Sequence, residues 1–269
     1  MGVHLARVIS IANQKGGVGK TTTAINLAAS LAASELRVLL VDTDPQGNST
    51  SGLGIPKADG MLTVYDVLSG SATAQEAIIP TSYEGLSILP ADKNLVAGNL
   101  DLVDMEDRER VLRRATDSLR DQFDYILIDC PPALDLLTLN ALVASDSVLV
   151  PIQCEFFALE GISQLMDTID RVKSSFNQPL EIEGVLLTMY DDRTNLTRQV
   201  ENDLRDFFGT DVFHTVIPRS IRLAEAPSFG KPILVYDPRS RGAESYIQLA
   251  KEVLKNEQKP RTAATQSAW

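Results

Sequence analysis

The chain carries near its start the stretch Ile9-Ser-Ile-Ala-Asn-Gln-Lys15-Gly-Gly-Val-Gly-Lys20-Thr21-Thr22-Thr23. An apolar run that predicts a strand over 8–12 leads into three glycines, and an Ala- and Leu-rich pattern predicts a helix over 20–33. A Gly-rich turn between a strand and a helix is the context of a phosphate-binding P-loop. The general motif has another glycine ahead of Gly19, and Gln14 stands in its place. The stretch nevertheless predicts a P-loop.

The predicted loop suits a polyphosphate anion. Gly16, Gly17 and Gly19 let successive backbone N–H groups point inward, and the start of the following helix adds its positive dipole end. Lys20 is expected to reach the β- and γ-phosphates, and the Thr21 hydroxyl is expected to ligate Mg²⁺. The predicted nucleotide-binding residues of the loop are Lys15, Gly16, Gly17, Val18, Gly19, Lys20, Thr21 and Thr22. The predicted cofactors are ATP and Mg²⁺.

The apolar segments predict an α/β fold. Most are short, rich in Val, Ile and Leu, and do not alternate with polar residues, so both faces of each strand are expected to be buried. Helical patterns lie between them, which favours a doubly wound, mostly parallel sheet with helices on both faces. The predicted strands are 8–12, 36–42, 86–89, 125–129, 147–152 and 182–189, and the predicted helices are 20–33, 106–122, 134–144, 159–176, 195–208 and 245–256. We predict one domain over 1–257 and a disordered tail over 258–269.

Acidic residues lie at the ends of two of the predicted strands. Asp42 ends one strand, Asp44 lies just past it, and Asp129 ends another strand. Ligands of doubly wound sheets bind at the carboxyl ends of the strands. We therefore predict that Asp129 holds Mg²⁺, that Asp42 helps set the magnesium shell, and that Asp44 positions the attacking water. One such Asp alone is as well explained as a turn cap, but two beside a P-loop favour catalysis.

The net charge, the apolar runs and the few cysteines and histidines argue against several classes of protein. A net charge of −11 over 269 residues favours solubility and argues against a wholly basic nucleic-acid-binding domain. No run of 18 apolar residues predicts a membrane span, and residues 1–12 read as a strand rather than a signal peptide. Cys130 and Cys154 are expected to be buried, reduced thiols, and the spacing of His4 and His214 suits no zinc site. A cytoplasmic location is predicted.

Several blocks of sequence identify a family. Lys15, a second lysine ahead of the glycines, resembles the deviant Walker A motif of the ParA/MinD family of ATPases. The resemblance continues through Asp42-Thr-Asp-Pro-Gln-Gly-Asn48, Asp129-Cys-Pro-Pro132, Thr188-Met-Tyr-Asp191 and Val216-Ile-Pro-Arg-Ser-Ile-Arg-Leu-Ala-Glu-Ala-Pro-Ser-Phe-Gly230. It spans nearly the whole chain and is greatest for the small chromosomal ParA proteins of the Soj type. Gln14 is no departure within that branch.

The resemblance implies an ATP-controlled switch. Lys15 would reach across a nucleotide-sandwich homodimer to the partner's phosphates, and Asp44 would support hydrolysis. The residues implied near adenine are Met189, Pro218, Arg219 and Ser220. The ATP-bound dimer would bind double-stranded DNA without sequence preference. A ParB-like centromere-binding protein would stimulate hydrolysis and release the ATPase from the nucleoid.

A local basic segment makes DNA binding compatible with an acidic chain. Residues 214–242 carry five basic against two acidic side chains, a net charge of +3. Arg193 and Arg222 match the positions at which the family contacts DNA. A patch this small predicts weak, salt-sensitive binding by a monomer, which dimerisation would strengthen through avidity. The alternative for each arginine is an ion pair with a surface carboxylate.

Two other functions compete with a DNA-segregation (chromosome or plasmid partition) ATPase. A MinD-like, membrane-recruited regulator would end in a basic amphipathic helix, whereas residues 254–269 contain Pro260 and no apolar stripe, so no membrane is expected. A metabolic P-loop enzyme of the nitrogenase-reductase or dethiobiotin-synthase kind is the third possibility. The reductase type needs cysteines for an iron–sulfur cluster between subunits, and Cys130 and Cys154 do not supply a convincing set.

Overall fold

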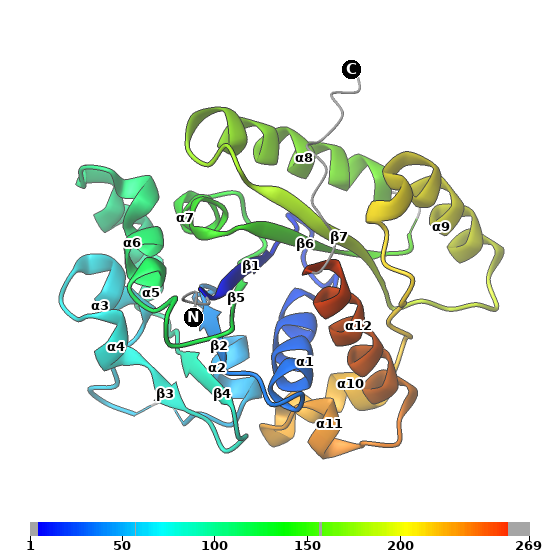
Figure 1. Cartoon of the computed structure of the whole chain (residues 1–269), viewed down its shortest axis with the longest axis horizontal. Coiled ribbons are helices and arrows are strands. Elements are labelled where there is room, and N and C mark those ends of the chain that lie inside the picture. The colour runs from blue at the N-terminus through cyan, green and yellow to red at the C-terminus, as the bar shows by residue number, and fades with distance from the viewer. Residues whose placement is uncertain (1–4, 57, 156–157, 258–269) are drawn as a thin grey trace.

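The computed structural model describes residues 5–56, 58–155 and 158–257. In that part of the chain seven strands form one sheet in the order β3-β4-β2-β5-β1-β6-β7 (Figure 1). The strands are β1 (Arg7–Ile11), β2 (Val38–Asp42), β3 (Ile79–Pro80), β4 (Leu86–Leu89), β5 (Tyr125–Asp129), β6 (Ser147–Gln153) and β7 (Glu181–Thr188). Neighbouring strands run parallel, save the short antiparallel edge pair of β3 and β4. The predicted mostly parallel, doubly wound sheet is confirmed.

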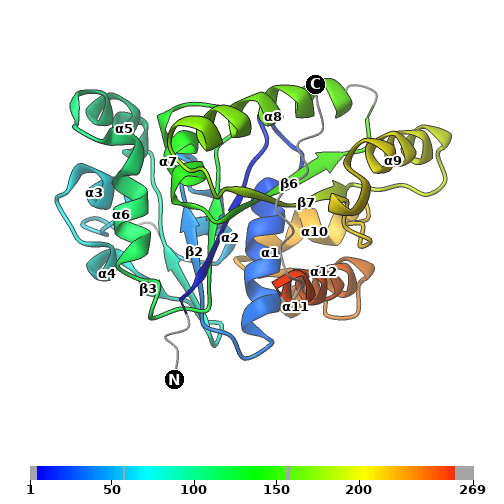
Figure 2. The same cartoon turned by 45° about the horizontal axis from the view of Figure 1, so that its top comes forward.

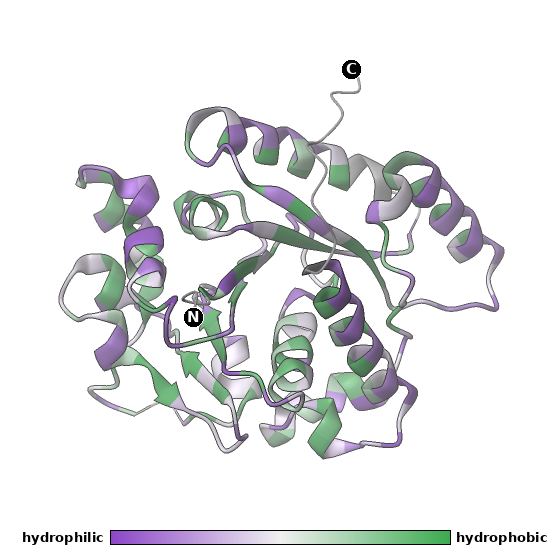
Figure 3. Ribbon diagram, in the orientation of Figure 1, coloured by the Kyte–Doolittle hydropathy of each residue, from purple (hydrophilic) through white to green (hydrophobic). Residues whose placement is uncertain are grey.

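Helices cover both faces of the sheet. They are α1 (Lys20–Ala32), α2 (Asn48–Gly52), α3 (Val64–Ser69), α4 (Ala74–Ala77), α5 (Leu95–Asp101), α6 (Val111–Asp117), α7 (Leu136–Ala144), α8 (Ala158–Ser175), α9 (Asn195–Phe208), α10 (Ile221–Glu225), α11 (Ile233–Tyr236) and α12 (Arg241–Glu257). Figures 1 and 2 place α7 and α8 on one side of β6 and β7, and α1 with α12 on the other. The apolar colour follows the central strands, and polar colour gathers on outer helices such as α12 (Figure 3).

The two faces have separate hydrophobic cores. Val8 of β1 packs into the core beneath α7 and α8, whereas its neighbour Ile9 packs into the core with α1 and α12. Successive side chains of a strand point to opposite faces, so both residues are buried only because both faces are covered. This explains why the strand sequences are continuously apolar.

Two of the predicted elements differ from the structure in ways that its contacts and backbone angles explain. The helix predicted over 106–122 is broken: a 3₁₀ turn at Arg108–Arg110 precedes α6, which ends at Asp117. Asn140 of α7 donates to the Arg108 carbonyl at 2.8 Å and accepts from the Leu112 amide at 3.1 Å, so a tertiary contact replaces helical hydrogen bonds. The last predicted strand stops at Thr188 because Met189 has φ +49°. The predicted tail over 258–269 lies outside the described residues.

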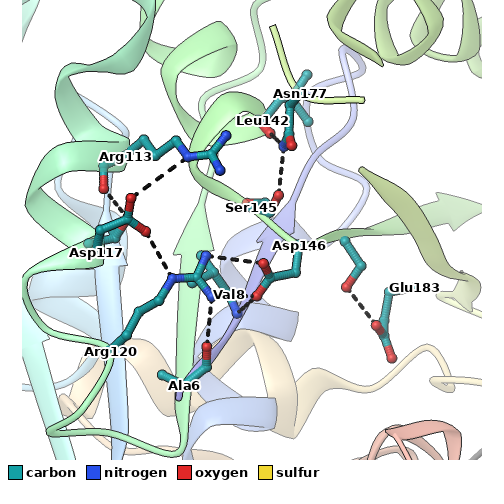
Figure 4. Close-up of polar contacts among 12 residues, drawn as sticks. Ala6, Val8, Arg113, Asp117, Arg120, Leu142, Ser145, Asp146, Asn177 and Glu183 are labelled. Carbon is teal, nitrogen blue, oxygen red and sulfur yellow. Dashed lines mark hydrogen bonds and ion pairs between the residues drawn. The ribbon is translucent and has the colours of Figure 1, made fainter. Parts of the chain in front are cut away.

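The sheet brings Asp42, Asp129 and the P-loop together at the carboxyl ends of its central strands. Asp42 of β2 and Asp129 of β5 are register partners, and Ile11 of β1 pairs with Asp129 on the other side. The P-loop leaves β1 at this end and leads into α1. At the other end of the strands, the Arg120 guanidinium donates hydrogen bonds of 2.9–3.0 Å to the Ala6 carbonyl and the Asp146 carboxylate (Figure 4). Among the described residues, none of the helices combines the length and apolar character that crossing a membrane requires.

Candidate nucleotide and magnesium site

A pocket of about 370 Å³ lies at the start of α1. Its lining residues are Gly16, Gly17, Gly19, Lys20, Thr21, Thr22, Asp44, Gln46, Asn48, Pro132 and Met189. Gly17 and Gly19 have φ of +76° and +88°, a left-handed backbone that side chains other than hydrogen disfavour. The fold thus assembles eight of the predicted site residues around one cavity.

Lys20 places a positive charge inside the loop. The residue is 7% exposed, and its Nζ donates a 3.0 Å hydrogen bond to the Lys15 carbonyl. Burial lowers the pKa of Lys20, and the nearby charge of Asp129 opposes that shift. A largely desolvated ammonium with a single backbone partner favours an anion beside it, as the predicted contact with β- and γ-phosphates requires.

Asp129 offers an oxygen that fits a magnesium ion. The residue is fully buried, and its Oδ2 accepts a 2.8 Å hydrogen bond from the Ser49 hydroxyl. Its Oδ1 is buried with no hydrogen-bond partner among the described residues, which is costly unless a ligand compensates. Burial raises the pKa of Asp129, and the charge of Asp42 raises it further. A divalent cation would relieve both effects.

Asp42 uses its oxygens differently. Its Oδ2 accepts from the backbone amide and the hydroxyl of Thr50 at 2.8 and 2.7 Å, and its Oδ1 accepts from the Asp44 amide at 3.2 Å. Burial raises the pKa of this carboxyl also. Asp42 therefore organises the segment after β2. Its predicted part in the magnesium shell stays a prediction.

No cluster of three or more His, Cys, Asp or Glu side chains within the described ranges is arranged to hold a metal. In a magnesium site of the nucleotide-dependent type, one or two protein oxygens share the ion with phosphates and water. Thr21 and Asp129 are the protein groups that fit such a site. Thr21 lines the phosphate pocket, and its side chain lowers the pKa of Asp129 without forming a regular hydrogen bond to Oδ1 in the described structure.

Two predicted P-loop residues do not line the pocket. Lys15 turns away, and its Nζ forms a 2.6 Å ion pair with Glu155, which follows β6. Val18 is 1% exposed, and its carbonyl accepts a 2.8 Å hydrogen bond from the Thr188 hydroxyl. Val18 thus connects the loop to the end of β7 through this hydrogen bond, whereas the Lys15 side chain lies outside its own phosphate pocket.

The residues predicted near adenine are divided between neighbouring pockets. Met189 lines the phosphate pocket, whereas Pro218 and Arg219 line a second pocket of about 390 Å³. Tyr190, which follows Met189 in sequence, lines the second pocket. Its amide donates to the Ile217 carbonyl at 2.9 Å and its carbonyl accepts from the Arg219 amide at 3.1 Å. The remaining predicted residue, Ser220, precedes α10 and lines neither pocket. Their nucleotide contacts stay predictions.

Both arginines predicted to contact DNA are paired with carboxylates of their own surface. Arg193 is 83% exposed and forms two hydrogen bonds of 2.8 and 2.7 Å with Asp191, which lower the pKa of Asp191 to about 2. Arg222 is 58% exposed and lies 3.1 Å from Glu225 and 3.6 Å from Asp237. A phosphate would compete with these partners. The DNA-binding role of both arginines stays a prediction.

Sequence reasoning missed several residues of the pocket. Gln46, Asn48 and Pro132 line it, and all three belong to the blocks that follow β2 and β5. Their place next to Asp44 and Asp129 was a usable signal, because residues just beyond strand ends surround the ligand in this fold class.

Comparison with known proteins places the chain among relatives that cover nearly all of it. Residues 6–182 match a family model described as AAA domain. The sporulation initiation inhibitor protein Soj of Bacillus subtilis is 56% identical over 94% of this chain and 100% of that protein. The chromosome partitioning protein ParA of Caulobacter vibrioides is 52% identical over 96% and 97%. The solved structure of cobyrinic acid a,c-diamide synthase from Mycobacterium smegmatis with bound ATP analogue and magnesium is 38% identical, with a TM-score of 0.84 over 98% of this chain and 100% of that chain.

Proposed function

Since the chain belongs to the ParA/Soj family of chromosome-partitioning ATPases, we propose that it is an ATP-dependent DNA-segregation ATPase. The observation that carries the ATPase part is the buried Oδ1 of Asp129, which has no hydrogen-bond partner among the described residues and lies at the same end of the sheet as a P-loop with a buried Lys20. This pair of groups, one anionic and one cationic, suits Mg²⁺ and the phosphates it neutralises.

Each residue of the pocket has a proposed part in hydrolysis. The amides of the loop around Gly17 and Gly19 bind the phosphates, and Lys20 holds the charge of the β- and γ-phosphates. Thr21 and Asp129 hold Mg²⁺, which supplies charge neutralisation at the transferring phosphoryl group when bound. Asp44 is 8% exposed and lines the pocket, with its Oδ1 accepting from the Gln46 amide at 2.9 Å. We assign its Oδ2 to orienting the attacking water.

ATP would act as a switch for DNA binding. Two copies close on the nucleotides, each Lys15 leaving Glu155 for the partner's phosphates. The closed homodimer presents two copies of the basic segment to double-stranded DNA, and this bivalency raises the affinity well above that of one weak contact. Hydrolysis, stimulated by a ParB-like centromere-binding partner, separates the copies and releases them from the nucleoid.

The test is duplex DNA binding by the Asp44→Ala protein with ATP, with ADP and without nucleotide, across a salt series. Slow hydrolysis in this variant should preserve the dimer, so we expect binding to unrelated sequences only with ATP, weakening steeply with salt. An ATP-dependent dimer that leaves DNA unbound would overturn the DNA-segregation proposal. A protein that stays monomeric with ATP in size-exclusion chromatography would overturn the switch itself.

A further inference from the structure

Ser49 contacts the predicted magnesium ligand from a distant part of the chain. It lies in the first turn of α2, is fully buried, and its Oγ donates a 2.8 Å hydrogen bond to Oδ2 of Asp129. The two residues are 80 positions apart in sequence. The contact therefore depends on how α2 folds back over the strand ends.

The place of Ser49 is fixed without help from Asp129. Gly47, with φ +63°, turns the chain into α2. The next residue after Ser49, Thr50, donates its amide and hydroxyl to Asp42 and accepts a 2.9 Å hydrogen bond from the Ala91 amide. These bonds fasten α2 to the ends of β2 and β4, so the Ser49 hydroxyl is held ready at the carboxylate of β5.

One hydrogen bond decides which oxygen of Asp129 remains available. A carboxylate with both oxygens free can turn about its last torsion, whereas here Oδ2 is engaged and Oδ1 is buried without a partner in the described structure. Groups that hydrogen-bond a metal-ligating carboxylate orient it for the metal. We propose that Ser49 is a positioning residue, whose hydroxyl holds Oδ2 of Asp129 so that Oδ1 ligates Mg²⁺ in the ATP-bound protein. The inference rests on the proposed Mg-ATP site.

The test compares Ser49→Ala with Ser51→Ala in the full chain. Ser51 is an exposed residue of the same helix, and its hydroxyl bonds the Gly47 carbonyl at 3.0 Å, so its removal is a matched control that leaves Asp129 untouched. Binding of N-methylanthraniloyl-ATP is followed while Mg²⁺ is titrated, and again in EDTA. We expect Ser49→Ala to raise the Mg²⁺ concentration at half-saturation by about tenfold or more. The affinity for metal-free nucleotide should be unchanged, and Ser51→Ala should match the wild type.

Two results would overturn the proposal. One is a magnesium midpoint in Ser49→Ala equal to that of Ser51→Ala. The other is an equal loss of nucleotide affinity with and without Mg²⁺, which signals general damage to the loop. If Ser49→Ala does not fold, Ser49→Cys, similar in size with a weaker donor, should shift the midpoint in the same direction by less, and an unshifted midpoint would reject the role. A wild-type protein with no magnesium dependence would instead overturn the proposed ATPase.

Discussion

The Nζ of Lys15 lies 2.6 Å from Oε2 of Glu155 in the same chain, so the extra lysine of the P-loop points away from its own phosphate pocket. Both side chains are more than two-fifths exposed, and exposed ion pairs contribute roughly 0.2–1 kcal/mol. Such a pair is easily exchanged for a phosphate contact. Meanwhile the backbone carbonyl of Lys15 stays inside the loop as the partner of Lys20.

This geometry predicts that Lys15→Ala separates dimerisation from nucleotide binding. Alanine keeps the carbonyl that Lys20 contacts and removes a side chain that lies outside the pocket. The variant should bind ATP about as well as the wild type but remain monomeric with ATP in light scattering. Lys20→Ala is the matched comparison, and it should lose ATP affinity because it removes the buried charge. Equal loss of ATP affinity in both variants would contradict the assignment of Lys15 to the partner's site.

The pairing of Arg222 with Glu225 and Asp237 predicts how a charge reversal acts. Arg222→Glu should keep the ATP-dependent dimer and lose DNA binding, since a local cation becomes a third anion. Each dimer would lose two phosphate contacts. For the binding that remains at low salt, the slope of log affinity against log salt should be smaller in magnitude by about 2, because each contact contributes roughly 0.9. Filter binding across a salt series measures both.

Arg114→Glu is the control for that experiment. It makes the same change of charge at an exposed position on α6, away from the basic segment in Figure 1. If Arg114→Glu weakens DNA binding as much as Arg222→Glu, the effect comes from net charge and the DNA-contact role of Arg222 is wrong.

The strands and the P-loop were predictable because their signals are local. Continuous apolar runs report burial on both faces, and a strand, three glycines and a helix report a phosphate loop. The helix predicted over 106–122 was wrong in extent because the Asn140 side chain, from another helix, forms hydrogen bonds with backbone groups on both sides of Arg110. The hydrophobic periodicity of a segment cannot predict a contact made by a residue from another helix.

The interior of the site was only partly predictable for the same reason. Asp42 and Asp129 were found because each is the last residue of a strand. Asp42 accepts hydrogen bonds from Thr50 at Oδ2 and from the Asp44 amide at Oδ1, whereas Asp129 has one buried oxygen without a partner in the described structure. The contacts made by Thr50 and Ser49 depend on how α2 folds over the strand ends. A five-residue helix that begins at Asn48 after a left-handed Gly47 is too short for a periodic pattern to predict it.

The two thiols should be unreactive in the folded protein. Cys130 and Cys154 are 1% and 8% exposed, and burial raises the pKa of both, that of Cys154 to about 12. The thiolate is the reactive form, so Ellman's reagent at mildly alkaline pH should titrate neither thiol in the native state. Both should react at once in concentrated guanidinium chloride. Rapid labelling of Cys130 without denaturant would show that the segment after β5 opens in solution.

A buried ion pair between Arg7 and Glu183 predicts a large effect on stability far from the site. Arg7 of β1 pairs with Glu183 of β7, whose side chain is 0% exposed and whose Oε2 also accepts a 2.7 Å hydrogen bond from Ser147. Arg7→Ala removes the cation and leaves the carboxylate in the core. Breaking a buried pair by removing one partner costs roughly 3–5 kcal/mol, so the free energy of unfolding in urea should fall by about that much.

An exposed ion pair provides the control for this prediction, because its removal should change the free energy of unfolding much less. Arg113 and Asp117, which lie 3.7 Å apart on α6 (Figure 4), are each more than a third exposed, so Arg113→Ala should cost less than about 1 kcal/mol. Arg7→Met tests the cause, because it restores apolar volume without charge. If loss of the charge dominates, Arg7→Met should be nearly as unstable as Arg7→Ala. A recovery to wild-type stability in Arg7→Met would mean that packing by the arginine stem, and not its pairing with Glu183 across β6, provides the stabilisation.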